Sequence, residues 1–267
     1  MSETLLTDGP LLLVDQPKPG IVRICMNRPQ SFNALSSEMM LALQSQLELI
    51  KGDASCRVVV LSSKGRAFSS GHDLKEMRNH PDRDFYEKLF AQCSRLMMSL
   101  QSLPQPVVAQ VDGIATAAGC QLVAMCDLAV ASQSSRFAVS GIHYGLFCAT
   151  PSVGLTRNVS RKIAMEMLLT GDFISADQAL ERGLINRSVA PDALEEVVLE
   201  LCMKIIEKPA VAIEMGKALF YQQAEMGLSA AYQLAGQVMA CNMMDPAAQE
   251  GFQAFLEKRP PAWKPSI

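Results

Sequence analysis

Short runs of β-branched and apolar residues alternate with longer amphipathic segments from Leu11 to about Val139. Four of these runs predict strands, namely Ile21–Met26, Val58–Ser62, Val107–Val111 and Leu128–Ala131. From Ser36 to Lys51, apolar residues recur every three or four positions, which predicts a helix with one apolar face and a serine cap at its start. Strands that alternate with helices of this length are typical of βαβ units around mainly parallel strands, and they predict an α/β fold.

The pattern changes after Pro191, where the strand-like runs end and only helical periods remain. The predicted helices are Leu194–Glu207, Ala210–Glu225, Ser229–Met244 and Pro246–Lys258. We therefore expect a core over residues 1–192 and a helical C-terminal region over residues 193–267. Several methionines in this second region are interpreted as fillers of core and interface gaps, without a chemical role.

Composition narrows the class of protein and of partner. Of the 267 residues, 49% are hydrophobic and 19% are charged, which is enough to bury a large core. The net charge of −3 provides no basic surface for nucleic-acid phosphates, so a small molecule or a protein is the expected partner. Polar or charged residues interrupt every apolar run, and we expect no membrane span.

The eight cysteines are scattered and form no CxxC pair. They are interpreted as reduced thiols in the core, rather than as a disulfide framework or a metal site. The first residues lack the basic and apolar pattern of a secretory signal, and the sequence leaves open whether an organelle transit peptide preceded them.

Two segments place a turn of small residues between a strand and a helix. In residues 58–74, a buried strand leads through such a turn to a helix that begins near Asp73. In residues 106–122, the strand Val107–Val111 leads through an Asp-Gly turn to the small residues Ala115–Gly119. Turns of this kind expose backbone N–H groups, and the start of a helix adds unpaired donors and a positive dipole end. Together, the two turns can direct donors at one oxyanion or carbonyl oxygen.

The motifs FSSGHDL (68–74) and DGIATAAGCQL (112–122) resemble the two oxyanion-loop signatures of the crotonase, or enoyl-CoA hydratase/isomerase, superfamily. Three further stretches resemble that family in the same order: MNRPQSFNAL (26–35), CDLAVAS (126–132) and MDPAAQEGFQAFLEKRPPAW (244–263). The resemblance implies a crotonase-like spiral of ββα repeats. It also implies helices that form a homotrimer, often as a dimer of trimers.

The same resemblance implies an acyl-CoA ligand with its coenzyme A bent along a groove. Carried over by position, the backbone amides of Ser70 and Ala118 hold the thioester oxygen, while Gly71 and Gly119 permit its close approach. The adenine side is lined by Ser31, Phe32, Ala67 and Ser69. Neither a metal nor any cofactor besides this coenzyme A is expected.

Two departures from the family pattern concern its catalytic glutamates, whose positions are taken here by Gln121 and Gly141. Hydration of an enoyl thioester requires groups that accept and donate protons, and the loss of each typically costs about 10²- to 10⁴-fold in rate. Glutamine can bind a water molecule but cannot take its proton, and glycine has no side chain. We therefore expect weak or absent enoyl-CoA hydratase activity.

Nearby polar residues have both ordinary and catalytic interpretations. His72, His143 and Tyr144 are interpreted mainly as hydrogen-bonded or exposed side chains, with a catalytic role as the minority hypothesis. Asp73 is interpreted as a helix cap and Asp112 as a turn residue.

Three functions remain open from the sequence. The first is an acyl-CoA-binding protein of fatty-acid metabolism, and the second is an enzyme with different chemistry, a decarboxylase, isomerase or thioesterase that uses His143, Tyr144 or His72. The third is a structural subunit that joins oligomers through its helical region. The resemblance implies the mitochondrial matrix as the compartment, with the cytoplasm as the alternative.

Overall fold

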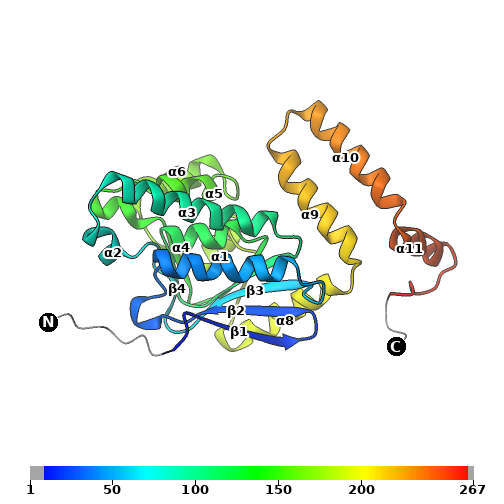
Figure 1. The fold of residues 1–267 in the computed structure, drawn as a ribbon, viewed down its shortest axis with the longest axis horizontal. Coiled ribbons are helices and arrows are strands. Elements are labelled where there is room, and N and C mark those ends of the chain that lie inside the picture. Colours follow the sequence, from blue (N-terminus) through cyan, green and yellow to red (C-terminus); the bar gives the residue numbers. More distant parts are fainter. Residues whose placement is uncertain (1–8, 264–267) are drawn as a thin grey trace.

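A six-stranded sheet in the order β1-β2-β3-β5-β7-β10 forms the centre of the computed structural model, which describes residues 9–263 (Figure 1). Its strands are β1 (Leu12–Lys18), β2 (Ile21–Met26), β3 (Val58–Ser63), β5 (Val107–Val111), β7 (Leu128–Ser132) and β10 (Arg187–Val189). Every neighbouring pair is parallel except β1 and β2. The predicted α/β fold with mainly parallel strands is confirmed, and all four predicted strands are present.

Helices cover both faces of this sheet, because successive side chains of a strand point to opposite faces. Val59 and Leu61 of β3 belong to the cluster beneath α1 (Ser37–Lys51), α3 (Arg83–Ser102) and α4 (Ala118–Met125). Val58 and Val60 pack instead with α8 (Leu194–Ile206) on the opposite face. The expected serine cap of α1 is Ser36, whose Oγ accepts the Met39 amide at 3.2 Å.

A second sheet of short strands lies beyond the ends of the long strands. It has the order β4-β6-β8-β9, formed by β4 (Ala67–Ser69), β6 (Ile114–Thr116), β8 (Arg136–Ala138) and β9 (Ile174–Ser175). Along the chain, β3-β4, β5-β6 and β7-β8 each form one long and one short strand, and each pair is followed by one or two α-helices. This repetition is the ββα spiral implied by the resemblance.

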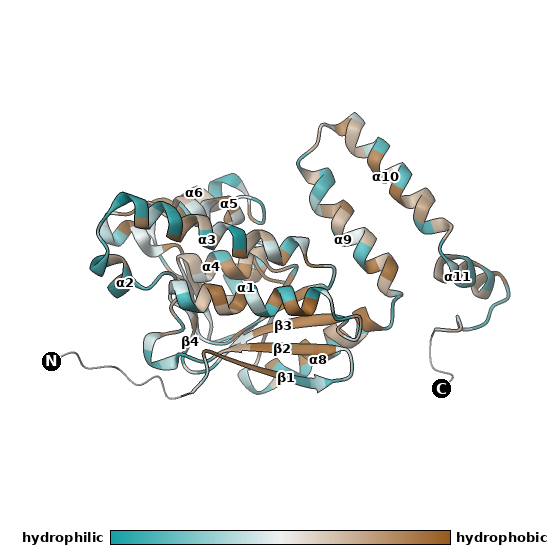
Figure 2. Cartoon of the chain, viewed as in Figure 1, coloured by the Kyte–Doolittle hydropathy of each residue, from teal (hydrophilic) through white to brown (hydrophobic). Residues whose placement is uncertain are grey.

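The last three helices leave the body of the molecule. They are α9 (Ala210–Ala224), α10 (Leu228–Met243) and α11 (Pro246–Leu256), and Figure 1 shows them extending away from the sheet. Figure 2 shows apolar segments along these helices, and Phe220, Met239 and Phe255 are among their exposed large apolar residues. α8, in contrast, covers the sheet, so the projecting part begins at Ala210. The expected division between residues 192 and 193 stays a prediction.

A buried polar cluster fastens α9 to the body. The Lys217 ammonium donates to Asp127 Oδ2 at 2.6 Å and to the carbonyl oxygens of Leu100 and Gln105 at 2.8 and 2.9 Å. The Tyr221 hydroxyl donates to Asp127 Oδ1 at 2.8 Å. Because α9 has no fully buried residue, this cluster is a main attachment of the projecting helices.

We expect the substitution Lys217→Met to lower the free energy of unfolding by about 3–5 kcal/mol, because it leaves the Asp127 carboxylate buried without its cation. The side chains of Lys217 and Asp127 are only 7% and 14% exposed. Urea denaturation measures the effect. The matched control is Lys208→Met, at a lysine that is 54% exposed, with an expected change within about 0.5 kcal/mol. Similar losses in both variants would contradict the anchoring role.

Further expectations concern membranes, metals and cysteines. Within residues 9–263, no helix is long and apolar enough to span a membrane. The same part of the chain contains no cluster of three His, Cys, Asp or Glu residues suited to a metal ion. Seven of the eight cysteines are buried and Cys241 is exposed.

Candidate functional site

The two small-residue turns lie side by side because the short strands that lead into them, β4 and β6, are parallel neighbours. A Cβ atom added at Gly119 would lie 2.2 Å from the Ser69 carbonyl oxygen, and one added at Gly71 would lie 3.0 Å from the Ala118 nitrogen. Gly71 also has a φ of +88°, which favours glycine. Glycine is therefore required at both contacts between the turns.

The backbone amides of His72 and Ala118 are free donors of these turns that belong to residues of the cavity wall. Neither donates to a backbone acceptor within residues 9–263, and Ala118 is the first residue of α4, whose amide has no partner inside the helix. Both residues line the same cavity. Both N–H groups are thus available to a ligand in this cavity.

The expected role of Ser70 needs a correction. Its amide donates to the Phe32 carbonyl oxygen at 3.0 Å, so its hydrogen is already engaged. The following residue, Gly71, donates its amide to Ser69 Oγ at 3.2 Å. The next amide along the chain, that of His72, is the free one, and sequence reasoning missed it because the sequence does not show which amides the neighbouring loop engages.

Asn33 positions the first turn, a role that the sequence interpretation did not assign. Its side chain is fully buried, accepts the Arg28 amide at 2.8 Å, and donates to the carbonyl oxygens of Lys64 and Ala67 at 2.8 and 2.7 Å. Its left-handed φ of 50° is a conformation that asparagine tolerates better than most residues. Asn33 thereby ties the loop that accepts the Ser70 amide to the strands before the turn.

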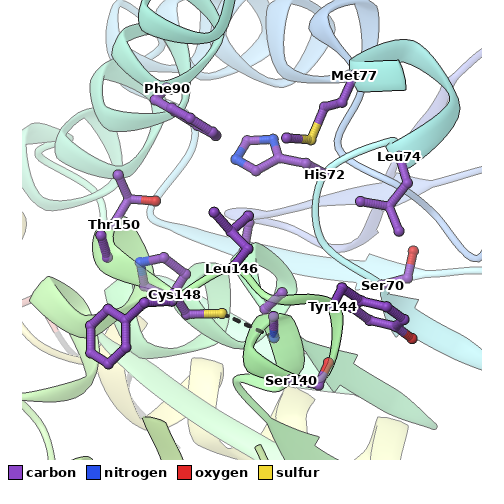
Figure 3. A pocket seen from close by; sticks show the side chains of 16 residues that line it. Ser70, His72, Leu74, Met77, Phe90, Ser140, Tyr144, Leu146, Cys148 and Thr150 are labelled. Atoms are coloured by element: carbon purple, nitrogen blue, oxygen red, sulfur yellow. Dashed lines mark hydrogen bonds between the residues drawn. The ribbon is translucent and has the colours of Figure 1, made fainter. Parts of the chain in front are cut away.

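A cavity of about 180 Å³ opens beside the two free amides. Its lining includes Leu74, Met77, Phe90, Leu146, Phe147 and Pro151, together with Ser70, His72, Ser140, Gly141, Tyr144 and Cys148 (Figure 3). No aspartate or glutamate is among the described residues that line it. The cavity is therefore an apolar chamber with few polar groups and without a carboxylate.

The two positions expected for catalytic glutamates have different surroundings. Gln121 lies in α4, is 5% exposed and does not line the cavity, and its buried Oε1 has no partner within residues 9–263. Gly141 lines the cavity from the 3-10 helix Ser140–Tyr144. A Cβ atom there would lie 2.6 Å from the Leu146 carbonyl oxygen and 2.8 Å from Cys148 Sγ. The segment that follows Gly141 thus fills the space that a side chain at this position needs.

The alternative catalytic residues are not equally placed. His143 Nε2 contacts the Thr170 carbonyl oxygen at 2.8 Å, and His143 does not line the cavity. Tyr144 lines the cavity but is 76% exposed. Asp73 caps α2 (Leu74–Asn79), because its Oδ1 accepts the amides of Lys75 and Glu76. The cap interpretation of Asp73 is confirmed, whereas the position of His143 gives its catalytic hypothesis no support.

His72 and Cys148 are the titratable groups of the cavity with shifted pKa values. Burial lowers the pKa of the His72 imidazole below its ordinary value of 6.5, so the ring is neutral at neutral pH. Burial raises the pKa of the Cys148 thiol, so it stays protonated. Figure 3 shows the hydrogen bond of 3.3 Å by which the Gly141 amide donates to Cys148 Sγ.

The four residues expected on the adenine side are not all accessible. Phe32 is 38% exposed, and the Arg66 guanidinium lies 4.6 Å from its ring centroid. Ser31 is half-buried. Ala67 and Ser69 are buried at 2% and 0% exposure, so their side chains do not form a surface for a ligand. The expectation for Ala67 and Ser69 therefore needs a correction, whereas Ser31 and Phe32 remain candidates.

Comparison with known proteins agrees with this architecture. The family model described as enoyl-CoA hydratase/isomerase matches residues 16–266. A Xenopus laevis protein named enoyl-CoA hydratase domain-containing protein 3, mitochondrial, is 44% identical over 262 residues, which cover 98% of this chain and 89% of the relative. The human protein of the same name is 45% identical over 244 residues, which cover 91% and 80%.

Two solved structures have nearly the same fold. A Mycobacterium smegmatis structure titled enoyl-CoA hydratase has a TM-score of 0.94 and 58% identity, and covers 96% of this chain and 99% of its own. The structure of human enoyl-CoA hydratase domain-containing protein 3 has a TM-score of 0.91 and 43% identity, and covers 95% and 100%. The chain therefore belongs to the enoyl-CoA hydratase/isomerase family, the crotonase superfamily.

Proposed function

We propose that this protein binds acyl-CoA thioesters of fatty-acid metabolism, with the thioester oxygen between the amides of His72 and Ala118, and has weak or absent enoyl-CoA hydratase activity. One observation carries the proposal: two free amides meet at an apolar cavity that no described carboxylate lines. Preorganised donors of this kind stabilise a carbonyl oxygen. A buried N–H group without an acceptor destabilises the folded protein, so binding of a ligand oxygen that accepts its hydrogen bond is favourable.

The missing acid and base groups support the second half of the proposal. An enoyl thioester in this cavity meets the neutral His72 ring and the protonated Cys148 thiol, but no described carboxylate that could deprotonate water. The Gln121 side chain lies outside the lining, and the backbone of Leu146 blocks position 141. Binding without efficient hydration follows from this arrangement.

The role of the two amides is tested by comparing crotonyl-CoA with its thioether analogue, which keeps the chain but lacks the carbonyl oxygen. We expect calorimetry to show about 10- to 100-fold tighter binding of the thioester, the effect of two hydrogen bonds of roughly 1 kcal/mol each plus unpaired amides. Equal affinities would overturn the assignment of the amides. Mass spectrometry of the same samples is expected to recover crotonyl-CoA unchanged.

An enzyme with different chemistry is the second candidate, and the unpaired Nε2 of His72 is the observation that favours it. Tyr144 also lines the cavity and is the other candidate group for such chemistry. Decarboxylation, isomerisation or thioester hydrolysis would each change the mass or the chromatographic position of an acyl-CoA. Incubation with a panel of acyl-CoAs distinguishes this candidate from simple binding.

The proposal extends to the oligomeric state of the protein and to its cellular compartment. The exposed apolar residues on α9–α11 support a homotrimer or a dimer of trimers, because an apolar surface of this kind needs a cover. The names of the vertebrate relatives include the word mitochondrial, whereas a structure at 58% identity comes from a bacterium. The mitochondrial matrix and the cytoplasm therefore both remain proposals for this chain.

A further inference from the structure

Asp127 lies at the far end of the helix that carries one of the two free amides. Ala118 is the first residue of α4, and Asp127 comes two positions after the last residue of α4, Met125. At 1.5 Å per residue, this helix spans about 12 Å. All of its residues are buried, so it cannot bend without disturbing the close-packed core. A shift at Asp127 therefore moves the Ala118 amide as well.

Asp127 also closes the base of the segment that carries the second small-residue turn. Its amide donates to the Val107 carbonyl oxygen at 3.0 Å, and its Oδ2 accepts the Val107 amide at 2.7 Å. Val107 begins β5, so residues 107–127 leave this base along β5, pass through the second turn and return along α4. The position of Asp127 thus fixes both arms of the segment that presents the Ala118 amide.

The carboxylate of Asp127 is held from α9, which lies beside the end of α3 (Figure 1). Lys217 and Tyr221 donate to its two oxygens at 2.6 and 2.8 Å. The Lys217 ammonium also donates to the carbonyl oxygens of Leu100, near the end of α3, and Gln105, before β5. α3 contributes a side chain to the cavity wall. One ammonium group therefore joins the ends of elements whose other parts form the cavity.

The chemistry of this cluster suits positioning better than simple attachment. Apolar residues of similar size often stabilise a fold as well as a buried ion pair does, whereas short hydrogen bonds to charged groups fix the relative position of their partners. α9 has no fully buried residue, so apolar packing alone does not define where it sits on the body. The cluster therefore sets the position of α9 relative to the base of α4.

We propose that Asp127 is a positioning residue for the Ala118 amide, and that its bonds to α9 couple acyl-CoA binding to the attachment of the projecting helices. The inference rests on the proposed function, because it concerns the amide that holds the thioester oxygen. With α9 attached, the cluster fixes α4, and the Ala118 amide meets that oxygen. With α9 detached, Asp127 loses its cation, and the amide loses its fixed position. By thermodynamic reciprocity, a ligand that requires the fixed amide also favours the attached state of α9.

The first experiment compares the parent protein with Lys217→Met by calorimetric titration of crotonyl-CoA and of its thioether analogue, which lacks the carbonyl oxygen. We expect the preference for the thioester to fall by about 5-fold in the variant, the effect of weakening one hydrogen bond to that oxygen. The affinity for the thioether should stay unchanged. Lys208→Met, at an exposed lysine, is the control and should keep the preference of the parent. An unchanged preference in folded Lys217→Met would show that the cluster has only a structural role.

Tyr221→Phe tests the same coupling with a smaller loss of stability. This variant keeps the ring and removes only the donor to Asp127 Oδ1. Because Lys217 still holds the carboxylate, we expect the preference for the thioester to fall by only about 2-fold. The matched control is Tyr232→Phe on α10, at a tyrosine that is 74% exposed, and it should have no effect.

Hydrogen exchange of the unmodified protein measures the reciprocal effect without any variant. The two ligands are added at the same multiple of their dissociation constants, so both stabilise the folded state equally by mass action. The amides of α9 should then exchange about 5-fold more slowly with the thioester than with the thioether. Equal exchange in α9, with a thioester preference in the parent, would overturn this inference and leave the proposed function standing. Equal affinity of the parent for both ligands would overturn both.

Discussion

Replacing Gly71 by alanine is expected to weaken acyl-CoA binding by about 100-fold, the consequence of losing the contacts of both amides with the thioester oxygen. The added Cβ atom would lie 3.0 Å from the Ala118 nitrogen and 2.9 Å from the Ala117 Cβ. It would therefore crowd the space in which a ligand oxygen meets the Ala118 amide. Calorimetric titration with crotonyl-CoA measures the loss, and circular dichroism verifies the fold.

The matched control is Gly183→Ala, because it separates backbone strain from blockage of the site. Gly183 has a φ of +82°, close to the +88° of Gly71, but a Cβ atom there meets its nearest neighbour, the Asn158 carbonyl oxygen, at an ordinary 3.5 Å. Gly183 does not line the cavity. This variant should lose a modest amount of stability, on the order of 1 kcal/mol, and keep its affinity. A folded Gly71→Ala variant with the affinity of the parent would show that the thioester lies elsewhere.

Introducing both glutamates, Gln121→Glu and Gly141→Glu, is expected to destabilise the protein instead of creating a hydratase. A side chain at position 141 collides with the Leu146 backbone, and overpacking of this kind typically costs about 1–3 kcal/mol. Position 121 is also separated from the cavity lining, so a carboxylate there is buried away from the ligand. Denaturation curves and a crotonyl-CoA hydration assay together test this expectation.

The two single variants separate the loss of stability from the absence of hydratase activity. Gln121→Glu should fold, with a raised pKa for the new buried carboxyl and without measurable hydration, because the second acid position is still empty. Gly141→Ala should already lose stability, because its methyl group makes the same collision. A stable double variant that hydrates crotonyl-CoA rapidly would show that residues 141–148 rearrange readily and that Leu146 and Cys148 do not exclude a side chain at position 141.

The long elements could be predicted from the sequence because their periodicity is strong. β2, β3, β5 and β7 consist of apolar, often β-branched residues, and α1 repeats its buried positions over 15 residues. The strands β4, β6, β8 and β9 were not predicted, since two or three residues are too few to show a period. β1 was also missed, because it is mostly exposed at the edge of the sheet.

The two turns of the site could be predicted from the sequence, but the backbone amides that are free to donate could not. Glycines and small residues marked both turns, and the structure brings the turns together. Which amide is free depends on a distant loop, because the Phe32 carbonyl engages Ser70 and leaves His72 available. Asn33, which holds that loop, acts through buried contacts with backbone atoms far along the chain, and such contacts leave no local pattern.

The rate of crotonyl-CoA hydration by the unmodified protein, measured at ligand concentrations shown by calorimetry to saturate the site, decides whether the site binds acyl-CoA without hydrating it. We expect saturable binding together with a turnover at least 10⁴-fold below the roughly 10 per second of an ordinary enzyme, because positions 121 and 141 carry no carboxylate that could transfer a proton. Turnover near 10 per second would contradict it. That result would show that His72, Tyr144 or another group supplies the proton chemistry without a carboxylate at position 121 or 141.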